Sequence, residues 1–165
     1  MTSEVDHALA TIFGDLAQKF GLSKPAGHCF AAIWRAAMAP TADDLTEICG
    51  LSRSGVSVAL KELRAWGLID AARSPGNRRD FFVAPADPWE LARRIIAERQ
   101  RRDLAPALDR LQDIAADARA ADLIALLEAT SAFTSTLAQQ DACDLKSLMT
   151  SDDDTPKKKK KKKKA

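Results

Sequence analysis

Apolar residues near the N-terminus recur every three or four positions, which is the spacing of one face of an amphipathic helix. The residues of this face are Val5, Leu9, Ile12, Leu16 and Phe20. Gly21 follows them and ends the predicted helix. We expect residues 1–20 to form an N-terminal dimerisation helix. A long helix that flanks a compact central domain has more apolar surface than that domain can bury, and a second copy of the chain can cover the rest.

Three short helices are predicted between residues 23 and 66, each introduced by a residue that caps helix N-termini well. These caps are Ser23, Thr41 and Ser52. The first two of these helices should turn a set of apolar residues inward: Phe30, Ile33, Trp34, Ala37, Leu45, Ile48 and Cys49. The third helix follows the second after a tight turn, and this order is typical of a helix-turn-helix.

The apolar pattern changes after Gly67. Leu68 and Ile69 lead into the turn signal Ser74-Pro-Gly-Asn77, and Phe81-Phe-Val83 follows. This pattern predicts a β-hairpin whose wing spans residues 72–80 and carries Arg78 and Arg79 near its tip. Together these elements predict a winged helix-turn-helix domain over residues 21–86.

The remaining chain reads as helical. Asp87 is a good N-cap, and Pro88 after it is a residue favoured at the first position of a helix. A coiled-coil-like seam follows, which Pro106 should kink or interrupt: Leu104, Leu108, Leu111, Ala115 and Ala118. The last helix is marked by Leu123, Leu126, Leu127, Phe133 and Leu137. We expect residues 87–149 to be a C-terminal dimerisation region, and the fold class to be mainly α with a small β-hairpin wing (α+β).

Composition narrows the class of protein. The chain has 165 residues, of which 46% are hydrophobic and 29% are charged, as in a globular domain. It has no apolar run long enough to span a membrane and no N-terminal signal pattern. Its three widely spaced cysteines lack metal-ligand spacing, so we expect reduced thiols, a cytoplasmic location, no metal and no cofactor.

The net charge of +2 conceals an uneven distribution. Eight of the 25 basic residues are Lys157 to Lys164, so residues 1–156 carry a net charge of −6. One basic block of net charge +3 lies within them, at residues 52–80. Residues 150–165 cannot bury a core, so we expect a disordered Asp/Lys-rich tail. It is either a solvated tail or a non-specific electrostatic arm.

The basic block covers the second helix of the helix-turn-helix, residues 52–66, and the wing that follows it. Val56, Ala59, Leu60 and Leu63 share the side that should pack. Short hydroxyls, an aliphatic group and cations occupy the other side, and these suit base edges, a thymine methyl and phosphates. Glu62 lies toward the other flank. The predicted DNA-binding residues are Arg53, Ser54, Ser57, Val58, Lys61, Arg64, Arg78 and Arg79.

Several stretches resemble the MarR superfamily: Gly21-Leu-Ser-Lys-Pro-Ala-Gly27, Leu51-Ser-Arg-Ser-Gly-Val-Ser-Val-Ala-Leu-Lys-Glu-Leu63 and Trp66-Gly-Leu-Ile69. Pro75-Gly-Asn-Arg-Arg-Asp-Phe-Phe82 and Asp87-Pro-Trp-Glu90 resemble its GbsR branch more narrowly. The resemblance implies a homodimeric winged-helix transcription factor, often a repressor, released from double-stranded DNA by a small ligand of choline or betaine type. Asn77 departs from the acidic residue that often precedes the wing arginines.

Other functions fit the sequence less well. An enzyme is disfavoured, because neither His7 nor His28 has a Ser, Cys or carboxylate partner at a spacing that is typical of a catalytic site. A winged-helix protein-interaction module or a non-specific DNA-binding protein remains the alternative. The three tryptophans, Trp34, Trp66 and Trp89, can be read as a cage for a quaternary ammonium, but core packing is the favoured interpretation. Cys29 and Cys49 are interpreted as structural thiols.

Overall fold

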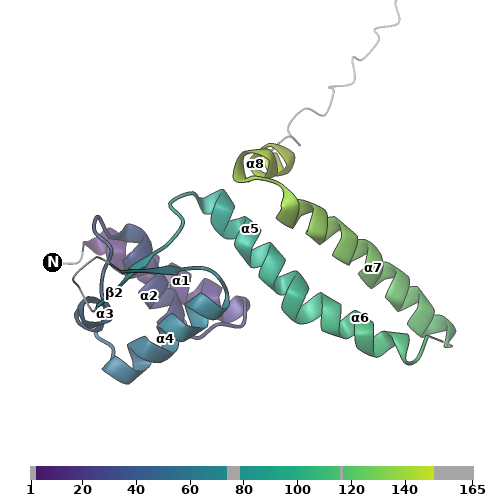
Figure 1. Cartoon of the computed structure of the whole chain (residues 1–165), viewed down its shortest axis with the longest axis horizontal. Coiled ribbons are helices and arrows are strands. Elements are labelled where there is room, and N and C mark those ends of the chain that lie inside the picture. The colour runs from purple at the N-terminus through teal and green to yellow at the C-terminus, as the bar shows by residue number, and fades with distance from the viewer. Residues whose placement is uncertain (1–2, 74–78, 116, 151–165) are drawn as a thin grey trace, which may run out of the picture.

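The computed structural model describes residues 3–73, 79–115 and 117–150. Figure 1 shows a cluster of short helices with a hairpin, followed by a long helical arm. The elements are α1 (Glu4–Lys19), α2 (Lys24–Arg35), α3 (Ala42–Cys49), α4 (Arg53–Ala65), β1 (Asp70–Arg73), β2 (Asp80–Val83), α5 (Pro88–Arg99), the π-helical segment η1 (Gln100–Leu104), α6 (Ala105–Gln112), α7 (Ala118–Gln139) and α8 (Ala142–Thr150). The predicted fold class, mainly α with a small hairpin wing, is confirmed.

The helix boundaries in the first half follow from local capping. The side chains of Ser23, Thr41 and Ser52 each accept a hydrogen bond from a backbone N–H in the first turn of α2, α3 and α4. At α3 the Asp44 carboxylate returns the interaction to the Thr41 backbone, which completes a capping box. Gly50 ends α3 with φ +62°, a left-handed conformation that glycine adopts at little cost. The three predicted caps are confirmed.

Helices α1 and α2 pack very closely. A Cβ atom added to Gly27 of α2 would lie 2.3 Å from the carbonyl oxygen of Phe13 in α1, so only glycine fits there. The ring of Phe13 also meets Phe30 edge-on, with 5.2 Å between centroids. Three residues of the predicted apolar face remain about half exposed: Val5, Ile12 and Leu16. That face is therefore largely unpacked within one chain.

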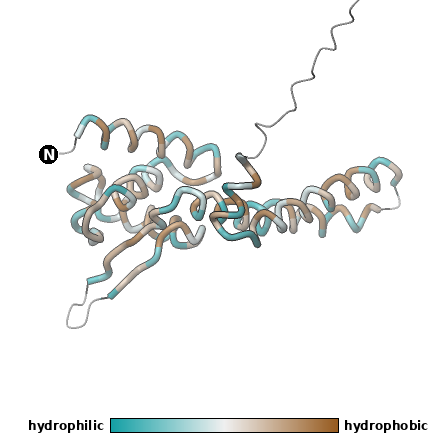
Figure 2. Tube along the Cα trace, turned by 90° about the horizontal axis from the view of Figure 1, so that it is seen from above, coloured by the Kyte–Doolittle hydropathy of each residue, from teal (hydrophilic) through white to brown (hydrophobic). Residues whose placement is uncertain are grey.

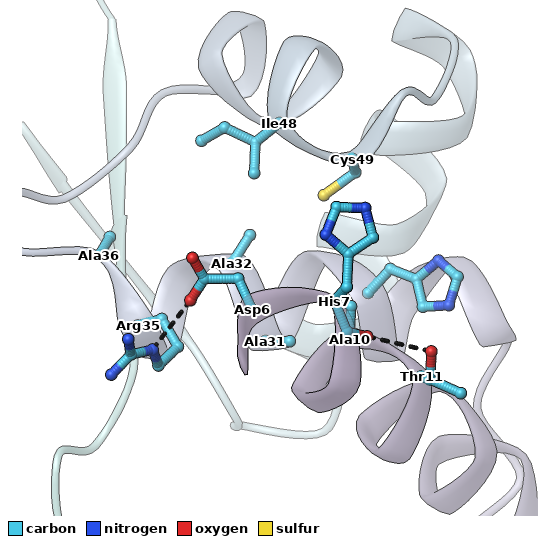
Figure 3. Close-up of a pocket in the computed structure, with 11 residues that line it drawn as sticks. Asp6, His7, Ala10, Thr11, Ala31, Ala32, Arg35, Ala36, Ile48 and Cys49 are labelled. Carbon is cyan, nitrogen blue, oxygen red and sulfur yellow. Dashed lines mark hydrogen bonds and ion pairs between the residues drawn. The ribbon is translucent and has the colours of Figure 1, made fainter. Parts of the chain in front are cut away.

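The hydrophobic core lies between α1, α2, α3, α4 and the hairpin. Its buried residues are Ala17, Leu22, Ala26, Cys29, Phe30, Ile33, Leu45, Val56, Ala59, Leu60, Leu63, Trp66, Leu68, Ile69 and Phe82. Leu91 and Ile95 of α5 pack against this core and join the helical arm to it. Two predicted core residues are wrong. Ile48 is 47% exposed and lines an open pocket together with residues of α1 and α2 (Figure 3), and Ala37 is exposed beyond the end of α2.

Strands β1 and β2 form the predicted antiparallel hairpin, in a register that runs from the Asp70–Val83 pair to the Arg73–Asp80 pair. Figure 2 shows the two strands projecting beyond the helices. The base of β2 is tied to the start of α3, because the Phe82 N–H donates to the Pro40 carbonyl at 2.9 Å. The turn signal at residues 74–77 and Arg78 lie outside the described residues.

The second half of the chain is a helical hairpin. Figure 1 shows α5, η1 and α6 as one arm with α7 antiparallel to it. The interruption predicted at Pro106 is confirmed, because the π-helical segment lies directly before α6, which carries this proline in its first turn. The single seam to Ala118 is wrong: α6 ends at Gln112, and Ala118 already belongs to α7. The sequence patterns did not separate α8 from α7.

Within the described ranges, the model contains no helix with the length and hydropathy needed to cross a membrane. The tail predicted for residues 150–165 lies outside the described part of the chain, apart from Thr150 at the end of α8.

Candidate nucleic-acid interface

Helix α4, the second helix of the helix-turn-helix, has one buried and one exposed face. The buried face is the predicted one: Val56, Ala59, Leu60 and Leu63. The start of the helix is fixed by Ser52, whose Oγ accepts a hydrogen bond from the Gly55 N–H at 3.1 Å. The helix is therefore held through its apolar side, which leaves the opposite side open to a partner.

The opposite side of α4 carries the predicted contact residues. All six in this helix are exposed: Arg53, Ser54, Ser57, Val58, Lys61 and Arg64. Val58 is 62% exposed although its side chain is apolar. An aliphatic group between hydroxyls and cations can contact a thymine methyl while its neighbours reach base edges and phosphates. The structure thus brings these six residues onto one accessible surface.

Two of these side chains already have intramolecular partners. Arg53 Nη2 lies 3.5 Å from Asp43 Oδ1, and both side chains are largely exposed. The hydroxyls of Ser54 and Ser52 are 3.1 Å apart, and either oxygen can donate. Exposed interactions of this kind contribute at most about 1 kcal/mol each. Contacts to a phosphate can therefore replace them at little cost.

The acid in α4, Glu62, is turned away from this surface. Its carboxylate accepts a hydrogen bond from the Ser23 hydroxyl at 2.5 Å and from the Ser23 N–H at 3.3 Å. Ser23 is the N-cap of α2, so the carboxylate lies on the side of α4 that faces the protein. The expectation that Glu62 occupies the other flank of the helix is confirmed. The exposed face of α4 consequently carries cations and hydroxyls without a carboxylate of its own helix.

The exposed face of α4 borders a hollow shared with the hairpin. This hollow has a volume of about 510 Å³ and is open to solvent. Its lining combines predicted contact residues with the first turn of α3 and with β2: Ala42, Ser57, Leu60, Lys61, Arg64, Ala65 and Phe82. The geometry therefore joins the helix and the wing in one concave surface, which no spacing in the sequence indicated.

An ion pair braces the described part of the wing. Arg73 Nε donates to Asp80 Oδ1 at 2.7 Å across the last pair of the β1–β2 ladder. This hydrogen bond raises the pKa of the Arg73 guanidinium further above its usual value. Asp80 is not among the residues predicted from the sequence, although the hairpin register alone places it opposite Arg73. Arg73 therefore faces its strand neighbour and is not directed freely toward a ligand.

Of the two predicted wing arginines, the structure describes Arg79, which is exposed. Its charge acts on Asp44 at the start of α3. The pKa of Asp44 is lowered, mainly by the hydrogen bonds from the Thr41 backbone and hydroxyl and also by the charge of Arg79. Arg79 and the N-terminal turn of α3 are therefore close enough to interact electrostatically. Arg78 lies outside the described residues.

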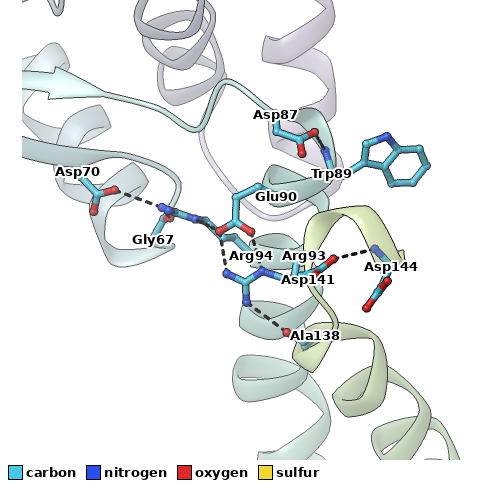
Figure 4. A network of polar contacts seen from close by, with 10 residues as sticks. All are labelled: Gly67, Asp70, Asp87, Trp89, Glu90, Arg93, Arg94, Ala138, Asp141 and Asp144. Carbon is cyan, nitrogen blue, oxygen red and sulfur yellow. Dashed lines mark hydrogen bonds and ion pairs between the residues drawn. The ribbon is translucent and has the colours of Figure 1, made fainter. Parts of the chain in front are cut away.

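A polar network links the helical arm to the end of α4 (Figure 4). Glu90 accepts hydrogen bonds from Arg93 at 2.7 Å and from Arg94 at 2.9 Å. Arg94 also donates to the Gly67 carbonyl at 2.7 Å, and Arg93 donates to the Ala138 carbonyl of α7 at 3.2 Å. The hydrogen bond from Arg93, aided by Arg94, lowers the pKa of Glu90 to about 2. Glu90 therefore stays ionised and holds both arginines in place.

Arg102 of the helical arm holds the last turn of α4 in place. It donates to the Ala65 carbonyl at 3.0 Å, and its guanidinium lies 5.0 Å from the centroid of the Trp66 ring. Glu98 pairs with Arg102 and orients it. Cations are favourable near the C-terminus of a helix, where backbone carbonyls lack intrahelical partners. The roles of Arg94 and Arg102 do not follow from the sequence, because both side chains bind backbone carbonyls that are distant in the sequence.

The structure does not bring the three tryptophans into a cage. Trp34 packs against Phe13 with ring centroids 5.8 Å apart, and Trp66 is buried in the core. Trp89 lies in the first turn of α5. Among the described residues, no two tryptophan rings contact each other. Over the same residues, no cluster of three His, Cys, Asp or Glu side chains has a geometry that could hold a metal ion.

Comparisons with known proteins bear on the helix-turn-helix and on the fold. Residues 34–80 match the model of the MarR family. A solved structure described as a transcriptional regulator superposes with a TM-score of 0.68 and 18% identity, covering 81% of this chain and 95% of that one. A transcriptional regulator from Thermotoga maritima gives a TM-score of 0.41 and 16% identity, with 81% and 92% coverage. No curated protein matches the chain. Residues 34–80 are therefore similar to the MarR family, and the fold of the chain is similar to that of a solved structure.

Proposed function

We propose that this protein is a sequence-specific, double-stranded DNA-binding transcriptional regulator of the MarR type. The observation that carries the proposal is the division of α4 into two faces. One face is buried in the core, and the other exposes hydroxyls, a valine and cations while its acid, Glu62, is bonded to Ser23. The match of residues 34–80 to the MarR family supports the same function.

In the proposed complex, α4 lies in the major groove and the wing reaches the adjacent minor groove. Ser57 and Val58 contact base edges, while Lys61 and Arg64 reach phosphates. The wing arginines, Arg78 and Arg79, enter the minor groove, where positive charge is favoured. The hollow between α4 and the hairpin suits this arrangement, because a phosphate backbone can pass through it between the two elements.

We propose that the protein acts as a homodimer with residues 21–86 as its DNA-binding domain. Residues 1–20 and 87–149 supply the dimer interface in this proposal. Large apolar side chains are exposed along α1 and α7: Val5, Ile12, Leu16, Leu123, Leu126 and Phe133. Their burial against a second copy removes this surface from water. Two half-sites about one turn of DNA apart, roughly 34 Å, are then expected.

The resemblance of residues 75–82 and 87–90 to the GbsR branch extends the proposal to regulation. We propose that the protein is cytoplasmic and represses transcription until a small effector releases it from DNA. Choline and glycine betaine are the effectors to test first, because the resemblance points to them. Within the second of these stretches, Asp87 caps α5 and Pro88 occupies its first position.

Binding to DNA from the region upstream of the protein's own gene tests the proposal. Affinity is measured by fluorescence anisotropy for that DNA and for a scrambled sequence, over a range of salt concentrations. We expect tighter binding to the upstream DNA by at least about a thousandfold. Lys61→Ala should reduce the slope of log affinity against log salt by about one, because one phosphate contact is lost. Ser57→Ala should change the sequences preferred in a selection.

Lys146→Ala is the matched control, because Lys146 is an exposed cation on α8, outside the helix-turn-helix. This variant should leave the salt slope unchanged. Equal affinity for upstream and scrambled DNA that Lys61→Ala leaves unaltered would support the protein-interaction alternative. Removal of residues 150–165 separates the tail from the domain. Without the tail, we expect weaker overall affinity with the sequence preference retained.

A further inference from the structure

Arg53 is the first residue of α4, where a cation does not stabilise a helix. Ser52 caps the helix, and its first turn, Arg53 to Val56, includes no acidic residue. The N-terminus of a helix carries a partial positive charge, so a guanidinium at this position is disfavoured electrostatically. The Arg53 side chain is also 84% exposed, so it contributes little to the core. A partner outside the helix therefore explains this arginine better than helix stability does.

A carboxylate of the preceding helix orients the Arg53 side chain. Arg53 Nη2 lies 3.5 Å from Asp43 Oδ1, between the two helices of the helix-turn-helix. Asp43 and Asp44 both lie in the first turn of α3, but the Asp44 carboxylate accepts hydrogen bonds from the backbone and hydroxyl of Thr41 in the capping box. Asp43 is therefore the carboxylate of this turn that pairs with Arg53.

The ion pair of Asp43 and Arg53 lies beside the proposed DNA-binding surface. Ala42, which precedes Asp43, lines the hollow between α4 and the hairpin, and Ser57 lines the same hollow. Arg53 and Ser57 are four positions apart on α4, so their side chains lie on the same face, about one helical turn apart. In a helix-turn-helix, the N-terminal residues of the second helix contact base edges. Arg53 therefore lies at the end of α4 that enters the major groove in the proposed complex.

The ion pair determines which group of the DNA suits Arg53. A phosphate that approaches the guanidinium also approaches the Asp43 carboxylate, and the two anions repel each other. A guanine presents two acceptors in the major groove, O6 and N7, and carries no net charge. A guanidinium has five N–H donors, so it can donate two of them to guanine while another stays directed at Asp43. The ion pair therefore favours a base edge over a phosphate as the partner of Arg53.

We propose that Arg53 reads a guanine in the major groove and that Asp43 is the positioning residue that directs it there. This assignment rests on the proposed DNA-binding function and adds a specific base contact to it. Successive residues of α4 rise by about 1.5 Å and successive base pairs by about 3.4 Å. The guanine therefore lies about two base pairs from the base that Ser57 contacts. The two side chains together specify one G·C pair in each half-site.

Selection of DNA from a randomised pool, followed by fluorescence anisotropy over a range of salt concentrations, tests this assignment with the full chain. The unaltered chain should prefer guanine at one position of each half-site by about tenfold or more over the other bases. Arg53→Ala should lose this preference. Unlike Lys61→Ala, it should leave the slope of log affinity against log salt unchanged, because a guanidinium paired with Asp43 neutralises no phosphate.

Asp43→Asn keeps the size of the side chain and removes its charge. The released guanidinium should then bind a phosphate, so the salt slope should steepen by about one while the preference for guanine falls. Glu47→Gln is the matched control, because Glu47 is an exposed carboxylate on the same helix. This control should change neither the slope nor the preference. Circular dichroism establishes that each variant is folded before DNA binding is measured.

A full chain without any sequence preference overturns this assignment together with the proposed function. If the unaltered chain selects a sequence and Lys61→Ala lowers its salt slope, the proposed function stands and the other variants decide the assignment. A lower slope in Arg53→Ala, with the selected sequence retained, would make Arg53 a phosphate contact. Equal effects of Asp43→Asn and Glu47→Gln would show that the charge of Asp43 acts without positioning Arg53. Either of these two results overturns the assignment alone.

Discussion

The carboxylate of Glu62 holds the N-cap of α2 from outside that helix, because it accepts a hydrogen bond from the Ser23 hydroxyl at 2.5 Å. The Ser23 oxygen in turn accepts a hydrogen bond from the Ala26 N–H. One charged side chain of α4 therefore fixes the start of α2 and also leaves the exposed face of α4 free of negative charge. The stability of the domain and the positive charge of the exposed α4 face therefore both depend on the hydrogen bond between Glu62 and Ser23.

Glu62→Ala should lower the free energy of unfolding by about 2 kcal/mol, because hydrogen bonds to a charged group in a partly buried site are lost. Glu62→Gln keeps an acceptor oxygen and should lower the free energy of unfolding by a smaller amount. Glu47→Ala on the exposed side of α3 is the control and should change stability by under about 0.5 kcal/mol. Urea unfolding measures all three variants. Similar values for Glu62→Ala and Glu47→Ala would contradict the role of the Ser23 contact.

Gly27→Ala should destabilise the protein by about 3 kcal/mol or more. The added Cβ would lie 2.3 Å from the Phe13 carbonyl oxygen, and backbone atoms cannot move aside as a flexible side chain can. Gly55→Ala is the comparison, because its Cβ would meet only the Ser52 hydroxyl at 3.2 Å and the Leu51 Cβ at 4.0 Å. That substitution should alter stability by about 1 kcal/mol at most. Thermal unfolding of the two variants checks the difference.

Glu90 should make stability sensitive to acid. Its pKa is about 2 in the folded protein, below the value of 4.5 for an unperturbed glutamate. The ionised form is therefore favoured by folding, so the contribution is complete above about pH 5 and disappears as the pH falls toward 2. The Glu90 side chain is 24% exposed, and water screens part of the interaction. We estimate the contribution at about 2 kcal/mol.

Urea unfolding of Glu90→Gln between pH 2 and 7 checks this prediction. The variant should be less stable than the unaltered chain at pH 7 and should approach it at pH 2. A constant difference at every pH would show that packing, and not ionisation, explains the effect. Glu128→Gln on α7 is the matched control.

Arg102→Ala should weaken the last turn of α4 more than Arg101→Ala does. Both arginines pair with Glu98, but Arg102 also donates to the Ala65 carbonyl and covers the Trp66 ring. We expect a loss of about 1–2 kcal/mol for Arg102→Ala and under about 0.5 kcal/mol for Arg101→Ala. Amide hydrogen exchange in α4 should rise selectively in the first variant. Equal exchange in both would contradict the proposed anchoring.

The sequence predicts those parts of the fold that depend on neighbouring residues. Ser23, Thr41 and Ser52 cap helices through backbone groups three positions away, so their roles follow from local chemistry. The buried face of α4 follows from helical periodicity in the same way. The hairpin was indicated by its turn residues, although the turn itself lies outside the described residues.

Long-range contacts cannot be predicted from this sequence, because helical and strand periodicity carries no information about them. Glu62 and Ser23 are far apart in the sequence, as are Arg102 and the carbonyl of Ala65. Ile48 satisfies the helical spacing for a core residue but is exposed, because the short helix α3 buries little beyond Leu45. For the candidate interface, the exposed positions on α4 follow from the sequence, whereas the hollow between α4 and the hairpin does not.

The π-helical segment at Gln100–Leu104 has a geometric consequence for the helical arm. A π turn accommodates one residue more than an α-helical turn, and each residue of an α-helix rotates about 100° around the axis. Side chains after the segment are therefore out of phase with those before it by about that angle. Deletion of one residue within Gln100–Leu104 would restore a continuous helical phase and swing the outer half of the arm to a different azimuth.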